Sequence, residues 1–88
     1  ELVDERTDLE REALRHERAA LLSTAIGTVI EERRAVLVMY EIEGLPMGEV
    51  AARLGIPENT GWNRLRLARA ELRQAVLRLA ASGCDLSG

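Results

Sequence analysis

The sequence predicts an all-α fold: a small bundle of four helices that contains a helix-turn-helix and ends in a long C-terminal helix. Three observations predict it. Apolar residues recur three and four positions apart, which is the spacing of one helix face. The chain has one Trp, one Tyr and no Phe, so its core must come from Leu, Val, Ile and Ala. Its 88 residues allow one compact domain and no second core.

The first two helices are marked by their boundaries. Apolar residues recur at helical spacing from Thr7 to Ile26, with Thr7 or Asp8 as possible caps and Gly27 as a stop. A second helix over 31–42 is apolar around most of its circumference, so we expect it to be the most buried. Residues 43–46 break it, because Gly is favoured just past a helix end and Pro fits the first turn of the next helix.

A helix-turn-helix follows from residue 46. The third helix runs from about Pro46 to Leu54, and Gly55 is able to adopt the left-handed conformation that ends it. Ile56 is expected to fill the corner. The fourth helix, the predicted recognition helix, should run unbroken from Pro57 to about Ala81 and be followed by a flexible tail over 82–88.

The fourth helix should present one polar face outward. If Gly61, Leu65, Ala68 and Leu72 face inward, the opposite side carries Asn59, Thr60, Asn63, Arg66, Leu67 and Ala70. A major groove admits one helix, and there Asn pairs with adenine and Arg with guanine. Such a face is also ordinary for any solvated helix, but the helix-turn-helix frame favours DNA binding.

Four further residues lie on the flanks of that face: Trp62, Arg64, Arg69 and Arg73. The arginines are candidates for phosphate contacts and the indole for sugar or methyl contacts. Arg69 lies nearer the core side, so it could instead be structural and pair with the second helix.

The charge distribution bears on DNA binding. The chain has 12 basic and 15 acidic residues, a net charge of -3. Residues 1–18 hold seven acids against four Arg, whereas residues 57–80 hold five Arg against two Glu, a local balance of +3. Phosphate attraction depends on the facing surface within about 8 to 10 Å, so the second balance matters more. Because +3 is modest, we expect weak, salt-sensitive binding that relies on a partner to hold the domain at its site.

Other function classes find little support. His16 lies among charges, Glu31 and Glu32 point in different directions, and no hydroxyl residue has a partnered base, so we expect no enzyme activity. The single Cys84 excludes an internal disulfide and a cysteine zinc cluster, and no metal or organic cofactor is implied. No membrane span or signal peptide is present, so we expect a cytoplasmic protein. The start at Glu1 without methionine suggests a piece of a longer chain.

The segment YEIEGLPMGEVAARLGIPENTGWNRLRLARAEL resembles region four, the C-terminal domain, of bacterial sigma factors of the extracytoplasmic-function group. The resemblance covers about residues 30–73. It implies recognition of the −35 promoter element, contact with the beta flap of RNA polymerase core, and control by an anti-sigma factor. Position by position, it implies DNA contacts from Asn59, Thr60, Trp62, Asn63, Arg66 and Leu67. Residues 1–6 would then end an interdomain linker, and residues 7–81 would form the domain.

Two features depart from the family pattern. Gly61 stands where a branched apolar residue is usual, and Gly within a helix costs about 1 kcal/mol relative to Ala, so we expect a loose start to the fourth helix. Trp62 and Leu67 stand where a basic residue is common, so the domain should depend less on charge and more on thymine-methyl or sugar contacts.

Two alternatives remain open on the sequence. A response-regulator output domain shares the EGL and EVAARLGI pattern, but it typically ends its recognition helix early and adds a short dimerisation helix. A protein-binding module would use the apolar second helix and the fourth helix to bind a regulator such as an anti-sigma factor, and exposed Trp62 and Leu67 would suit it.

Overall fold

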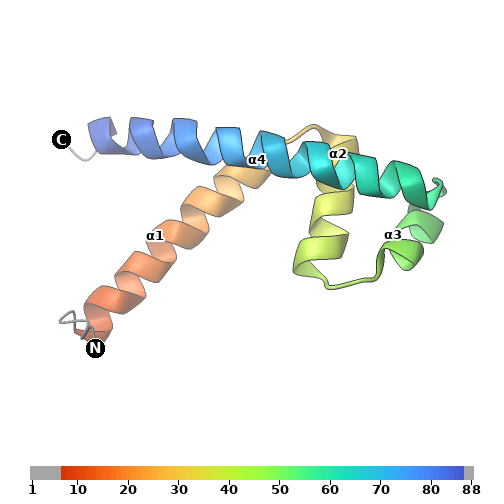
Figure 1. Cartoon of the computed structure of the whole chain (residues 1–88). Coiled ribbons are helices and arrows are strands. Elements are labelled where there is room, and N and C mark those ends of the chain that lie inside the picture. The colour runs from red at the N-terminus through yellow and green to blue at the C-terminus, as the bar shows by residue number, and fades with distance from the viewer. Residues whose placement is uncertain (1–6, 87–88) are drawn as a thin grey trace, which may run out of the picture.

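The computed structural model describes residues 7–86, with side chains to residue 82, and confirms the all-α fold there. The helices are α1 (Asp8–Gly27), α2 (Glu31–Leu37), α3 (Met47–Leu54) and α4 (Glu58–Leu86), and a π-helical turn, η1 (Val38–Ile42), continues α2. Figure 1 shows α1 and the C-terminal part of α4 diverging as two arms from the region of α2, while α3 sits beside the start of α4. Helix α4 is the common element, because it packs against α1, α2 and α3.

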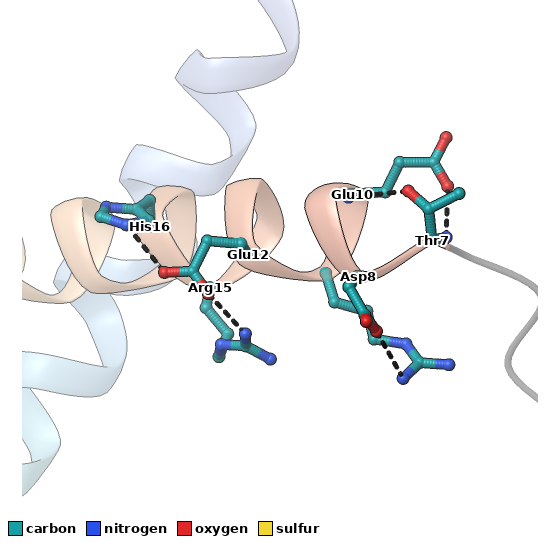
Figure 2. Close-up of polar contacts among 7 residues, drawn as sticks. Thr7, Asp8, Glu10, Glu12, Arg15 and His16 are labelled. Atoms are coloured by element: carbon teal, nitrogen blue, oxygen red, sulfur yellow. Dashed lines mark hydrogen bonds and ion pairs between the residues drawn. The ribbon is translucent and has the colours of Figure 1, made fainter.

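Helix α1 begins at a capping box. The Glu10 N–H donates to Thr7 Oγ1 at 3.1 Å and the Thr7 N–H donates to Glu10 Oε1 at 2.9 Å, so Thr7 is the cap (Figure 2). Glu12 contacts both Arg15, at 2.6 Å, and His16, at 3.2 Å. These pairs are exposed, so they contribute little to stability. His16 is thereby placed in a solvated charge cluster.

The second predicted helix contains a change of helix type. The α-helical hydrogen bonds end at Leu37, and in η1 the Glu43 N–H donates to Val38 O, five residues back, at 2.9 Å. Gly44 then adopts a positive φ of 76°, and the Leu45 N–H donates to Met39 O at 3.0 Å. The residues of this segment were correctly predicted as helical, but the π-helical turn was not predicted.

The expectation that residues 31–42 are the most buried is wrong. Only Val36 and Leu37 are fully buried there, and Ile42 is 61% exposed. The shorter α3 buries three residues, Met47, Val50 and Ala51. An apolar circumference does not bury a helix unless neighbours cover all sides, and the described residues leave the end of η1 uncovered.

The core lies where α2, α3 and the first half of α4 meet. Its buried members are Val29, Val36, Leu37, Met47, Val50, Leu65 and Ala68. The radius of gyration is 16.3 Å, whereas a compact domain of this length has about 12 Å. The molecule is therefore extended, with a small core and two projecting helical arms.

Helix α4 is longer than predicted. It continues unbroken to Leu86, past the predicted end at about Ala81. Residues 82–86 contain no proline, so no residue there prevents the helix from continuing. The predicted linker at 1–6 and the last two tail residues lie outside the described residues. The unbroken helix disfavours the response-regulator alternative, which calls for a second short helix after the recognition helix.

Candidate nucleic-acid interface

The corner between α3 and α4 is fixed at Gly55. With a φ of 69° and a ψ of 35°, Gly55 adopts the predicted left-handed conformation. The Gly55 N–H donates to Ala52 O at 3.3 Å. The Ile56 N–H donates to Ala51 O at 3.0 Å, which completes the hydrogen-bond pair that commonly closes a helix. Ile56 packs partly buried against the core, as predicted. The backbone of these two residues therefore sets the angle at which α4 leaves the turn.

The inward side of α4 is also as predicted. Gly61, Leu65 and Ala68 are buried, and Leu72 packs partly buried against the core. A Cβ on Gly61 would lie 2.6 Å from Met47 Sδ, which is closer than atoms of this kind approach. The glycine thus admits the Met47 side chain, which is 3% exposed, and brings α3 close to α4. With this side fixed against the core, the opposite side must face outward.

That outward side carries the predicted base-reading residues. Asn59, Asn63 and Arg66 are exposed, while Thr60 and Leu67 are half-buried. Arg66 Nη2 donates to Asn63 Oδ1 at 2.7 Å, so the two side chains form one unit, one helical turn apart. Both side chains keep further N–H donors that are able to bond other partners. Thr60 and Leu67 lie at the margins of the face, where their contacts with a ligand would be partial.

The flanking residues differ in what they contact. Arg64 is half-buried and Arg73 exposed, and neither forms an ion pair with any side chain the structure describes. Trp62 is 44% exposed and packs edge-on against Tyr40 of η1. Arg69 Nε donates to Glu41 Oε2 at 2.7 Å, and its guanidinium lies 6.0 Å from the centre of the Tyr40 ring. Arg69 is thus held by the second predicted helix, which was the structural role considered for it.

A second interhelical contact lies on the other side of α4. Glu71 accepts from the Arg33 guanidinium and from the Ile30 N–H, the latter at 3.2 Å. One carboxylate therefore joins the start of α2 to α4. Neither Glu71 nor Glu41 was predicted from the sequence as an ion-pair partner. The one available signal was composition: Glu58 and Glu71 are the only acids in the basic stretch 57–80.

The described residues place limits on other kinds of site. Among them, no group of three or more His, Cys, Asp or Glu side chains is arranged to hold a metal ion. Nor does that part of the chain include a helix of the length and hydropathy that a membrane span requires.

Comparison with known protein families is consistent with this helix-turn-helix geometry. A search of curated proteins finds no match for the chain. The family model described as sigma-70, region 4, matches residues 19–72, which include the C-terminal part of α1, the helix-turn-helix and the outward face of α4. The match spans more than half of the chain and begins earlier than the resemblance at about residue 30. The chain therefore belongs to the sigma-70 region 4 family, a family of DNA-binding domains of sigma factors.

Proposed function

We propose that this chain is the domain of an extracytoplasmic-function sigma factor that reads the −35 promoter element with the outward face of α4. One observation carries the proposal. Gly61, Leu65 and Ala68 are buried on one side of α4, and this leaves Asn59, Asn63 and Arg66 exposed together on the other. The fixed corner at Gly55 sets that face apart from α3, as a helix entering a major groove requires.

Within this proposal, Asn63 and Arg66 contact base edges, because amide and guanidinium groups discriminate bases in the major groove. Asn59 and Thr60 lie in the first turn of α4, where backbone N–H groups without helical partners attract phosphate. Leu67 and the exposed part of Trp62 offer apolar contact to sugars or thymine methyls.

The flanking arginines contribute phosphate contacts of unequal strength. Arg64 and Arg73 have no ion-pair partner among the described residues, so phosphate contact requires no bond to be broken. Arg69 must first leave Glu41. We therefore assign phosphate binding first to Arg64 and Arg73, and to Arg69 as a weaker contributor.

Protein partners belong to the same proposal. Weak DNA binding by a helix whose residues 57–80 sum to only +3 fits a domain that RNA polymerase core holds at the promoter, in the cytoplasm. A cleft of about 300 Å³ between α1, α2, η1 and α4 offers a surface for polymerase or for an anti-sigma factor. Its lining is mostly apolar, and the Glu41–Arg69 ion pair completes it: Leu22, Ile26, Leu37, Glu41, Ile42, Arg69 and Leu72. Asn63 and Arg66 do not line the cleft, whereas Arg69, the weaker phosphate contributor, does.

The test compares Arg66→Ala with Arg78→Ala, a control in the C-terminal half of the same helix. A duplex is first selected from a randomised pool by binding to the wild-type chain at low salt. We expect Arg66→Ala to lose about 1 to 3 kcal/mol on that duplex and to tolerate changes at one base pair, while Arg78→Ala retains full selectivity. Fluorescence anisotropy titrations with the selected duplex and its single-base-pair variants measure both the affinity and the base selectivity. An equal loss by Arg66→Ala on every duplex would remove Arg66 from base reading.

A further inference from the structure

The only two aromatic residues of the chain contact each other. Tyr40 lies in η1 and Trp62 in the first two turns of α4, and their ring centroids are 5.3 Å apart with an interplanar angle of 70°. This is the edge-to-face arrangement that aromatic rings prefer. The contact joins the π-helical turn to the flank of the outward face of α4, and the DNA contacts described above do not explain it.

Tyr40 is itself held in place. Its ring packs against the buried core cluster, and the Arg69 guanidinium lies 6.0 Å from the ring centre. Arg69 is in turn bound to Glu41, the next residue in η1. Hydrogen bonds from the Glu43 N–H to Val38 O and from the Leu45 N–H to Met39 O span the backbone of Tyr40 and close the turn. The Tyr40 ring is therefore held in place and is able to restrict the motion of the side chain packed against it.

Trp62 needs such an anchor. At 44% exposure the indole is only partly covered, and it stands beside Asn63 on α4. An exposed side chain on a helix loses rotamer freedom when it binds a ligand, and this loss weakens binding. A ring that is already fixed in the free protein avoids most of that loss.

We propose that Tyr40 is a positioning residue for DNA recognition: it holds the Trp62 indole so that the exposed part of the ring meets a sugar or a thymine methyl. This inference rests on the proposed function, since it assumes that α4 enters the groove. It assigns a role to the π-helical turn, which presents Tyr40 to α4 without itself touching DNA.

The first test measures the orientation of the ring without DNA. Because Trp62 is the single tryptophan, selectively excited fluorescence reports on this side chain alone. We expect Tyr40→Leu to shift the emission to the red and to lower its anisotropy, and Tyr40→Phe to behave as wild type because it keeps the ring. Met39→Leu, a change in the same turn, is the matched control and should leave the signal unchanged. An unchanged signal in Tyr40→Leu, or equal shifts in Tyr40→Leu and Tyr40→Phe, would overturn the proposal.

The second test measures binding to the duplex selected by the wild-type chain. Tyr40→Leu should weaken binding about three- to tenfold, which is the range of an aromatic pair, and Tyr40→Phe should restore it. In a Trp62→Ala background, Tyr40→Leu should cause no further loss. If Trp62→Ala binds as well as wild type, or if the two losses add fully, the proposal is overturned. Loss of base selectivity in Arg66→Ala would still support the proposed function in that case.

A measurement on the unmutated chain covers the possibility that Tyr40→Leu fails to fold. Proton NMR should show nuclear Overhauser contacts between the Tyr40 ring and the Trp62 indole, both in the free chain and with the selected duplex bound. Their disappearance on DNA binding would contradict a positioning role.

Discussion

The middle of this chain and its two arms, the N-terminal part of α1 and the C-terminal part of α4, are all helical, but only the middle has a buried core. Every fully buried residue that the structure describes lies between Ala25 and Ala75. Outside that span, Leu9 is 80% exposed and Leu77 59% exposed, although both lie in well-formed helices. Helical spacing therefore predicts where an apolar stripe lies, but it does not tell whether another element covers the stripe. The family match, residues 19–72, falls largely on the covered part.

The largest expected effect separates the two regions directly. Leu65 is 1% exposed in the core, so Leu65→Ala should destabilise the chain by about 2 to 5 kcal/mol through lost burial and a cavity. The same change at Leu9 should alter stability by less than about 0.5 kcal/mol. Urea unfolding followed by circular dichroism measures both. Comparable losses would mean that the α1 arm is covered in solution and that the comparison is wrong.

An intermediate effect probes the contact that brings α3 and α4 together. Gly61→Ala gains about 1 kcal/mol of helix propensity but places a Cβ against Met47 Sδ, so we expect no net gain or a loss of about 1 kcal/mol. In a Met47→Ala background the obstacle is gone, and the same substitution should stabilise by up to about 1 kcal/mol. Thermal and urea unfolding of the wild type, the two single variants and the double variant measure the coupling free energy between Gly61 and Met47. Equal effects in both backgrounds would show that Met47 does not constrain Gly61.

The smallest expected effect is on the salt dependence of DNA binding when single arginines of α4 are removed. Arg73→Ala should reduce the slope of log affinity against log salt by about one, because one phosphate contact is lost. Arg69→Ala should reduce it less, since Glu41 already partners that guanidinium. Titrations of the selected duplex over a series of salt concentrations measure the slopes. A larger reduction for Arg69 than for Arg73 would reverse the assignment of phosphate contacts.

Features set by local sequence were predictable, whereas most contacts between different helices were not. The spacing of residues along the chain was sufficient to predict the helices, the left-handed conformation of Gly55 and the inward side of α4, because each depends on residues of one segment. The π-helical turn was not predicted, and neither was the contact of Tyr40 with Trp62, which depends on how η1 and α4 cross. That Gly61 loosens the start of α4 stays a prediction, and the Met47 side chain that fills the space beside it was not predicted. The assignments of Asn59, Thr60, Asn63, Arg66 and Leu67 to DNA remain predictions.

The most direct test of the central claim, that the outward face of α4 enters the groove, is NMR mapping of the 88-residue chain. Backbone amide shifts are recorded as the selected duplex is added at low salt. The largest changes should cluster on residues 58–67 and, more weakly, at Arg73, while residues 8–20 of the α1 arm stay unchanged. Changes centred on the α1 arm, or on the end of α4 beyond Ala75, with residues 58–67 unaffected, would contradict the proposed interface.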